Sequence, residues 1–115
     1  MMAKFEITKR KNGEFQFNLK ASNGEIILTS EGYVAKYSCK KGIESVRKNS
    51  QNEKRFEKKV AKDNRVFFNL KSSNGQIVGT SEMYNSQAAM NNGIASVKKN
   101  APEAVVVDLT TTGKA

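Results

Sequence analysis

Alternating apolar and polar positions dominate the first thirty residues of the chain. The segments 4–9 and 14–20 each place apolar side chains at every second position, with polar or charged residues between them. A period of two is that of a half-buried β-strand. A third strand is predicted at about 26–30, where Ile, Ile and Leu follow one another. We therefore expect three antiparallel strands.

Turn signals separate these predicted strands. Asn12 and Gly13 both tolerate a positive φ, and their pair is the strongest short-range signal for a hairpin with a type I′ turn. The Ser-Asn-Gly run at 22–24 predicts the second hairpin turn.

After residue 32 the apolar period changes from two to about 3.6. Cys39, Ile43 and Val46 are spaced as one buried stripe of a helix predicted at about 35–48. This region therefore adds a helix to the three strands.

The whole pattern recurs at an offset of 51 residues. Residues 17–50 align without a gap with residues 68–101, and 18 of the 34 aligned positions are identical. Such a repeat predicts two copies of one β-β-β-α unit. A unit of about 50 residues buries too little apolar surface to be stable alone, so the two copies should share one core. Three aligned pairs should be buried: Phe17 with Phe68, Ile43 with Ile94, and Val46 with Val97.

The alignment also extends beyond the two copies. Phe5 aligns with Phe56, and Phe56 aligns in turn with Val107. We therefore expect the strand at about 55–60 to close the first unit while opening the second, and the strand at about 105–109 to complete what the N-terminal strand begins. A turn at Asp63-Asn64 stands in the second copy where the first has its Asn-Gly pair.

The predicted fold class is α+β: tandem β-β-β-α units related by a pseudo-twofold axis, a closing C-terminal strand, and an antiparallel sheet packed with two helices. We expect one compact domain over residues 1–115. Repeat 1 covers about 4–53, repeat 2 about 55–104, and the closing strand about 105–110.

The helix ends and interiors carry further signals. Ser86 stands where an N-cap acceptor would satisfy the first turn of the second helix. Interior glycines at matching sites, Gly42 and Gly93, indicate close packing against the sheet or the other helix. Asn49 and Asn100 are placed as residues that tolerate a left-handed conformation at the helix stop.

Composition and charge indicate a soluble globular domain in which any basic surface must be built by the fold. The chain has 20 Lys and Arg against 11 Asp and Glu, a net charge of +9, and the excess is spread over both halves. No apolar run is long enough to span a bilayer, and the first residues lack the apolar region of a signal peptide, so we expect a cytoplasmic protein without membrane contact. Net positive charge favours nucleic acid or anionic surfaces as partners.

Three paired motifs resemble those of the YegP-like family of small bacterial proteins of unknown function. KxSNGxI occurs at 20–26 and 71–77, TSExY at 29–33 and 80–84, and GIxSVxKN at 42–49 and 93–100. The resemblance implies tandem β-β-β-α units and cytoplasmic residence, and it implies no activity. Two positions depart from the paired pattern: Gly79 stands for Leu28, and Met83 for Gly32.

Residues suited to catalysis are few, and we expect no enzyme, cofactor or metal site. The chain has no His, the usual general base near neutral pH and the commonest metal ligand. Cys39 lies in the buried stripe without a His partner. Ser45 and Ser96 each begin an S-x-x-K pattern, but the companion motifs of that enzyme class are missing.

A second repeated set is polar and lies where each third strand meets its helix. Its members either satisfy backbone groups at the helix entry, with each tyrosine ring packed under its helix, or form two symmetry-related ligand sites. The set is Thr29, Glu31 and Tyr33 with Thr80, Glu82 and Tyr84.

The sequence is compatible with two functions. The first is an interaction or structural domain with an unidentified protein partner, as a monomer with internal pseudo-dimer symmetry. The alternative is a nucleic-acid-binding module in which outward Phe67 stacks a base and basic residues neutralise phosphates. These basic residues are Lys20, Lys71, Arg47, Lys48, Lys98 and Lys99.

Overall fold

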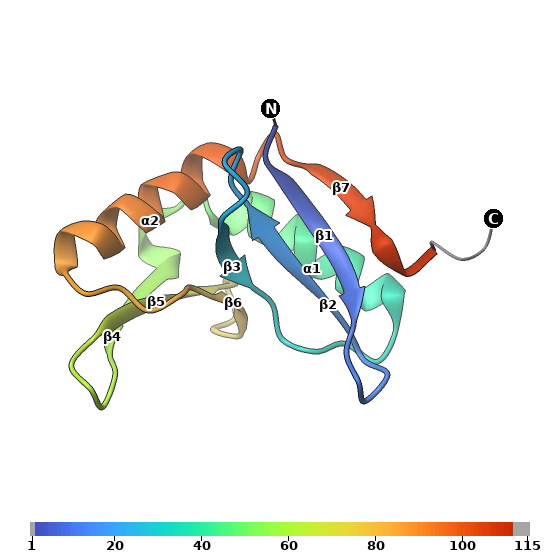
Figure 1. Cartoon of the computed structure of the whole chain (residues 1–115), viewed down its shortest axis with the longest axis horizontal. Helices are drawn as coiled ribbons and strands as arrows, with labels where there is room; N and C mark the ends of the chain where they lie inside the picture. Colours follow the sequence, from blue (N-terminus) through green and yellow to red (C-terminus); the bar gives the residue numbers. More distant parts are fainter. Residues whose placement is uncertain (1, 112–115) are drawn as a thin grey trace.

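The computed structural model describes residues 2–111, without the side chain of Thr111, and shows two copies with the same order of elements (Figure 1). The first copy contains β1 (Lys4–Lys9), β2 (Phe15–Lys20), β3 (Ile26–Thr29) and α1 (Lys36–Asn49). The second contains η1 (Glu53–Arg55, a 3-10 helix), β4 (Phe56–Val60), β5 (Val66–Lys71), β6 (Ile77–Thr80) and α2 (Gln87–Asn100). The described chain then ends with β7 (Val105–Asp108) and the short η2 (Leu109–Thr111).

All seven strands form one sheet in the order β4-β5-β6-β3-β2-β1-β7. The halves meet where Thr29 of β3 pairs with Thr80 of β6, which places the pseudo-twofold axis between these strands. Neighbouring strands are antiparallel except β7, which runs parallel to β1. The sheet is therefore mixed where an antiparallel one was expected, and the predicted fold class of tandem β-β-β-α units is confirmed.

One prediction about topology is wrong. The segment at 55–60 was expected to close the first unit, but β4 pairs with β5 alone within residues 2–111 and lies at the edge opposite to β7. Figure 1 shows β4 and β7 at opposite sides of the molecule. The reason is that α1 contacts β5 and β6 as well as β2. It therefore carries the chain across to the second unit, and only β7 returns to β1.

The hairpin turns share one geometry, which is not the predicted type I′ turn. In turn 10–14 the Gly13 N–H donates to Arg10 O (2.9 Å) and the Arg10 N–H to Glu14 O (2.7 Å). Only Gly13 has a positive φ (90°), because the Asn12 side chain instead accepts from the Glu14 N–H (3.0 Å). This is the longer loop that ends in a left-handed residue. The equivalent positive-φ residues of the other turns are Gly24, Asn64 and Gly75.

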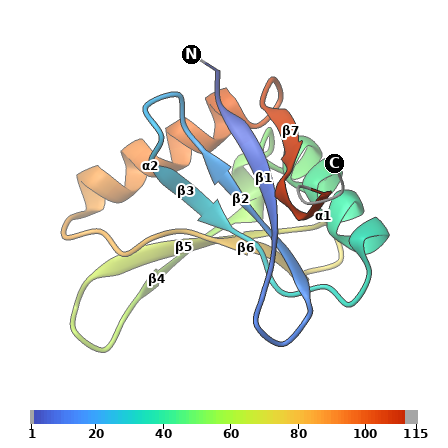
Figure 2. The ribbon, with the colours of Figure 1, turned by 45° about the vertical axis from the view of Figure 1, so that its right-hand side comes forward.

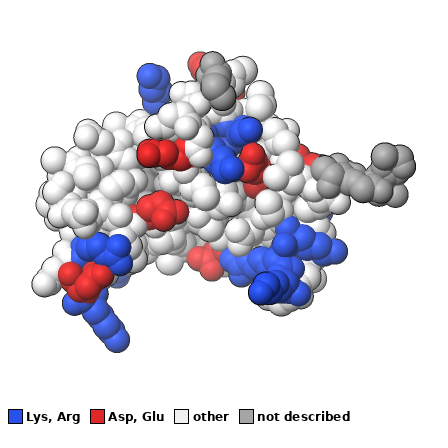
Figure 3. Space-filling view, in the orientation of Figure 1, with Lys and Arg blue, Asp and Glu red and all other residues white. Residues whose placement is uncertain are grey.

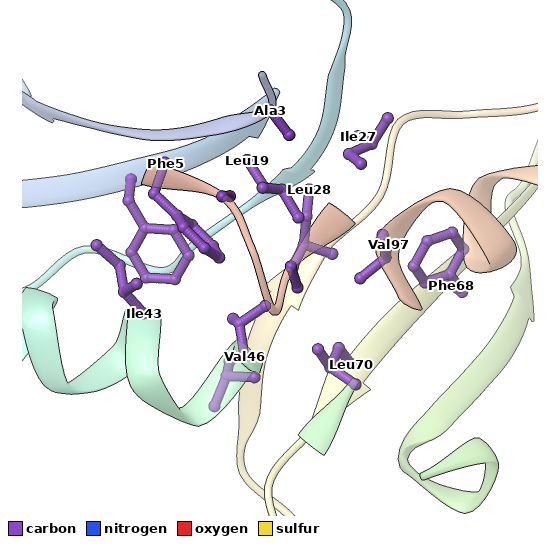
Figure 4. Packing of buried hydrophobic residues seen from close by; sticks show 14 of the residues in the cluster. Ala3, Phe5, Leu19, Ile27, Leu28, Ile43, Val46, Phe68, Leu70 and Val97 are labelled. Atoms are coloured by element: carbon purple, nitrogen blue, oxygen red, sulfur yellow. The ribbon is translucent and has the colours of Figure 1, made fainter. Parts of the chain in front are cut away.

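Both helices pack on one face of the sheet, where a continuous core joins the two copies (Figures 2 and 4). All three aligned pairs that were expected to be buried are buried, none of the six residues being more than 4% exposed. The aromatic packing is repeated as well. The Phe5 and Phe17 rings meet edge to face at 5.7 Å, and their counterparts Phe56 and Phe68 do so at 5.6 Å.

The pseudo-twofold axis explains why Gly79 stands where the first copy has Leu28. A Cβ atom at residue 79 would lie 2.7 Å from Leu28 Cδ2. In Figure 4 the Leu28 side chain lies between the cluster around Phe5 and the pair Phe68 and Val97. Two leucines at the axis would compete for the same volume, so one copy supplies the side chain and the other the space.

The interior helix glycines make room for the tyrosines. A Cβ at Gly42 would clash with the hydroxyl of Tyr33, and one at Gly93 with the hydroxyl of Tyr84. The Tyr33 ring stacks on Phe17 at 6.4 Å. The close packing indicated by the glycines is therefore confirmed, with a tyrosine as the neighbour.

The helix starts were predicted better than the helix stops. The Ser86 hydroxyl accepts from the Ala89 N–H (3.0 Å), as expected of an N-cap, whereas Ala35 begins α1 without a side-chain cap. The expected left-handed stop at the asparagines is wrong. Asn49 lies inside α1, and its side-chain amide donates to the Ser45 carbonyl oxygen (2.9 Å); Asn100 of α2 bonds in the same way to Ser96.

Candidate functional site

The two strand lysines of the predicted basic set are held by carboxylates. Lys20 Nζ lies 2.8 Å from Glu6 Oε1, and Lys71 Nζ lies 3.1 Å from Glu57 Oε1. The hydrogen bonds from these lysines hold the pKa of Glu6 and of Glu57 below the usual range. Both lysines already have an anionic partner, so neither offers an uncompensated charge to phosphate.

The helix-end cations of that set split into two kinds. Arg47 lies 5.2 Å from the centre of the Phe5 ring and donates to the carbonyl oxygens of Ala101 and Pro102 (3.1 Å each), which joins α1 to the end of α2. Lys98 pairs with Glu53. Lys48 and Lys99 are exposed and make no ion pair within the described part of the chain.

Positive charge gathers at the hairpin ends, which the sequence analysis did not single out. On the face in Figure 3, the lower Lys and Arg side chains lie over the β1–β2 hairpin at the right and the β4–β5 hairpin at the left, and others lie near the centre and at the upper left. Acidic side chains lie between these cations. This face therefore has no continuous basic surface. The exposed cations of the two hairpins are Lys9, Arg10 and Lys11 in the first, and Lys58, Lys59, Lys62 and Arg65 in the second.

The paired polar set does not form two compact sites. Thr29 and Thr80 are neighbours at the centre of the sheet, on the face opposite to the helices. Glu31 and Glu82 are exposed. Tyr33, with its counterpart Tyr84, packs under the helix, where burial raises the pKa of each phenol.

A polar row crosses the face of the sheet opposite to the helices. The register places Asn69 next to Thr80, whose hydroxyl donates to Asn69 Oδ1 (2.8 Å). The sequence shows these residues as outward positions of single strands, but only the strand order reveals the row. Its six members, from one half to the other, are Glu6, Asn18, Thr29, Thr80, Asn69 and Glu57.

The nucleophile candidates are engaged in the structure. Burial raises the pKa of Cys39 to about 11, which keeps its thiol protonated near neutral pH. The Ser45 hydroxyl accepts from Asn49 Nδ2 (3.0 Å), and Ser96 accepts from Asn100 in the same way (3.1 Å). Among residues 2–111, no three His, Cys, Asp or Glu side chains are grouped to hold a metal ion.

The outer edge of β4 presents backbone groups that no other strand uses. Ala61 N–H donates to Arg65 O across the hairpin (2.8 Å). The Phe56 N–H donates to Glu53 O at the end of η1. Because the direction of N–H groups alternates along a strand, those of Lys58 and Val60 point away from β5. Within residues 2–111, β5 is the only strand beside β4, so these groups face solvent. This edge is the candidate site.

The equivalent edge of β1 is covered. β7 pairs with β1 from Lys4 opposite Val105 to Ile7 opposite Asp108, and Val105 N–H donates to Ala3 O (3.2 Å). The pseudo-twofold axis relates β1 to β4, so β7 marks where a strand would lie along β4.

The residues at the two edges differ in one informative way. Ile7 is fully buried, and the aligned residue of β4 is Lys58, which is exposed and lies opposite Phe68 on the helix-covered face. Asp108 lies opposite Ile7 and forms an ion pair with Lys36 of α1, whose Nζ is 2.8 Å from Asp108 Oδ2. The residue of α2 aligned with Lys36 is Gln87. The alignment at an offset of 51 residues already shows these substitutions. Only the strand pairing shows that they lie at a covered edge and an open edge.

Comparison with known proteins identifies the family. The model of a domain of unknown function, DUF1508, matches residues 11–57 and 61–108, one segment in each copy. The chain belongs to the DUF1508 family. A UPF0339 protein of Pseudomonas aeruginosa is 56% identical over 108 residues, which cover 94% of this chain and 98% of that protein. YegP of Escherichia coli K12 is 51% identical over 106 residues, covering 92% and 96%. The resemblance to YegP-like proteins is thereby confirmed.

Two members of the family with solved structures have the same fold. The solution NMR structure of YegP from E. coli, a protein of unknown function, superposes with a TM-score of 0.90 at 50% identity and covers 95% of this chain and 94% of that one. The solution structure of a UPF0339 protein from Shewanella oneidensis gives 0.89 at 50% identity, covering 95% and 92%. In the described part of this chain, neither helix is long and apolar enough to cross a membrane.

Proposed function

We propose that this domain is a non-enzymatic interaction module that binds an extended segment of a partner protein along the outer edge of β4. The observation that carries the proposal is the difference between two symmetry-related edges: β7 covers that of β1, and within residues 2–111 no strand covers that of β4. Addition of a strand to an open sheet edge is a common mode of peptide recognition, in which main-chain hydrogen bonds supply affinity.

The side chains around the edge support this function. Lys58 and Lys59 are exposed and make no ion pair within residues 2–111, so both remain available to a ligand. Val60 is 67% exposed and Phe56 half-buried, which gives the same edge some apolar surface. A mixed edge of this kind suits a segment with both aliphatic and acidic residues.

The non-enzymatic part of the proposal is supported by the state of the nucleophiles. The raised pKa of Cys39 disfavours a thiolate, and the hydroxyls of Ser45 and Ser96 accept hydrogen bonds from asparagines one turn away.

Nucleic-acid binding is the less supported alternative. Lys20, Lys71 and Lys98 are paired with carboxylates, and Arg47 is held against Phe5 and two carbonyl groups. Only Lys48 and Lys99 of the predicted set are exposed without an ion pair in the described chain.

A displayed library of random peptides, selected on the full chain, tests the proposal. Proline at residue 58 removes an outward N–H without removing a bond to β5, because proline is tolerated on an edge strand whose N–H faces solvent. Selected peptides should bind the parent and the Lys58→Gln variant and lose binding to Lys58→Pro. Peptides that bind Lys58→Pro as well as the parent, or a library that yields no binder, would contradict the proposed site.

A further inference from the structure

We infer that the segment bound at β4 runs parallel to β4 and carries a carboxylate opposite Lys58, with an aliphatic residue two positions earlier. This inference rests on the proposed function and specifies the chemistry of the partner at the same edge. It is drawn from the one strand that the fold already binds in the equivalent place, β7 on β1.

The direction and register come from the β1–β7 pair. Phe5 lies opposite Val106, and Ile7 lies opposite Asp108, in a parallel arrangement. The offset of 51 residues carries Phe5 to Phe56 and Ile7 to Lys58. A segment in the same register therefore places an aliphatic side chain beside Phe56 and its residue two positions later beside Lys58.

The charges show why that later residue is acidic. At the β1 edge the residue in the strand is apolar, Ile7, and the cation for Asp108 comes from the helix, at Lys36. At the β4 edge the cation is in the strand, at Lys58, and the helix position aligned with Lys36 is Gln87, which is neutral. Each edge thus supplies one cation near the same point of the docked strand. The cation lies on the helix at the β1 edge and on the strand at the β4 edge, and in both places a carboxylate is the complementary group.

The same lysine argues against a second copy of this chain as the occupant. Two β4 edges in contact would bring Lys58 and Lys59 of one copy against those of the other, and like charges across a strand pair are unfavourable. The inner edge of β7 is already used by β1. Lys58 therefore excludes self-pairing and accepts an acidic partner, which is how charge confers specificity at an interface.

The chain itself supplies a probe with the inferred features. A synthetic peptide with the sequence of residues 102–110, PEAVVVDLT, contains Val106 and Asp108 at the required spacing. It is titrated into the full chain, labelled with ¹⁵N, up to about 1 mM, since an isolated strand is expected to bind weakly. We expect shifts in the amide signals of Phe56–Val60 and little change in those of β1.

A double-mutant cycle then tests the carboxylate. The Asp108→Asn version of the peptide and the Lys58→Gln variant of the protein should each weaken binding about two- to fivefold, as for an exposed ion pair, and the two changes together should weaken it no further. Lys11→Gln removes the same charge from the other hairpin and is the matched control, which should leave the affinity unchanged.

A spin label at the N-terminus of the peptide reports the orientation. In the parallel arrangement it should broaden the signals near Phe56 more than those near Val60. Broadening near Val60, equal affinity of the Asp and Asn peptides, or shifts at β1 in place of β4 would each overturn the inference, as would the absence of shifts at β4. The library selection judges the proposed function separately, because peptides selected there need be neither parallel nor acidic.

Discussion

The outer edges of β1 and β4 are related by the internal symmetry of the chain, yet one is covered and the other is open. The two strands align residue by residue, and their phenylalanines, Phe5 and Phe56, pack in the same way against the next strand. A single C-terminal strand follows the two copies, and it can cover only one edge. β7 covers β1, which leaves β4 as the unsatisfied counterpart.

This difference teaches how a duplicated unit becomes asymmetric. At the covered edge an isoleucine, Ile7, is fully buried, and at the open edge a lysine, Lys58, occupies the aligned position. Lysine on an edge strand is a common protection against unwanted pairing. The repeat thus keeps the same backbone in both copies and changes the side chain according to whether a strand is present.

The matched pair Ile7→Ala and Lys58→Ala should show the largest difference between the edges. Removal of the buried isoleucine should lower the free energy of unfolding by about 2 to 5 kcal/mol, through lost transfer energy and the cavity left behind. The exposed lysine should change it by no more than about 0.5 kcal/mol. Urea unfolding of both variants measures the difference. Equal losses would show that the edges are not distinguished by burial.

The helix stripe provides a control on the symmetric part of the fold. Ile43→Ala and Ile94→Ala should each cost about 2 to 5 kcal/mol, because both side chains lie in the shared core. A loss below about 1 kcal/mol in either variant, measured in the same urea series, would mean that the copy concerned does not contribute to a common core.

Acid should selectively weaken the covered edge. Hydrogen bonds from Lys36 and Thr110 lower the pKa of Asp108 from 3.8 to about 2. A lowered pKa in the folded protein gives stability that is fully present above about pH 4 and is lost as the pH falls through about 2. The contribution at neutral pH is at most roughly 2.5 kcal/mol. Asp108→Asn should remove that part of the pH dependence of the unfolding free energy. An unchanged profile between pH 2 and 4 would contradict the ion pair.

At the open edge, Lys58→Ile should leave stability nearly unchanged and promote self-association, because an uncharged edge strand can pair with another. Sedimentation velocity over a concentration series measures this, with Lys11→Ile as the control for an added isoleucine elsewhere. A Lys58→Ile variant that sediments like the parent at all concentrations would show that Lys58 does not protect the edge.

The smallest effect is expected from the helix-end lysines. We expect the parent to give no electrophoretic mobility shift with nucleic acid at about 50 mM salt. A triple variant with Gln in place of Lys48, Lys98 and Lys99 should therefore behave like the parent. Two results together would favour the nucleic-acid alternative: the parent shifts nucleic acid, and the triple variant shows a shallower salt dependence. The slope of log affinity against log salt concentration should fall by about one unit per phosphate contact removed.

Local pattern and repeat together predicted the elements, the shared core and the family. They did not predict which strands pair. The offset showed that Phe56 is equivalent to Phe5, and from this the strand at 55–60 was wrongly expected to pair within the first unit. The type I′ turn was also wrong, because the Asn12 side chain bonds to the Glu14 N–H and favours a longer loop.

The candidate site was less accessible to sequence reasoning than the fold. Lys20 and Lys71 were predicted to contact phosphate, but they pair with Glu6 and Glu57. These carboxylates lie on the neighbouring strands and are brought close only by the register. An open edge has no sequence motif of its own. It consists of backbone groups, and whether they are paired depends on the order of all the strands.

Amide hydrogen exchange, followed residue by residue in NMR spectra, tests the central claim most directly. The N–H group of Ile7 points toward β7, and that of the aligned Lys58 points toward solvent. We predict that the Ile7 amide exchanges at least about 100-fold more slowly than the Lys58 amide, relative to unstructured peptides, while Glu57 and Lys59 remain protected by β5. Protection of Lys58 equal to that of Ile7 would contradict the account, because the edge of β4 would then be covered.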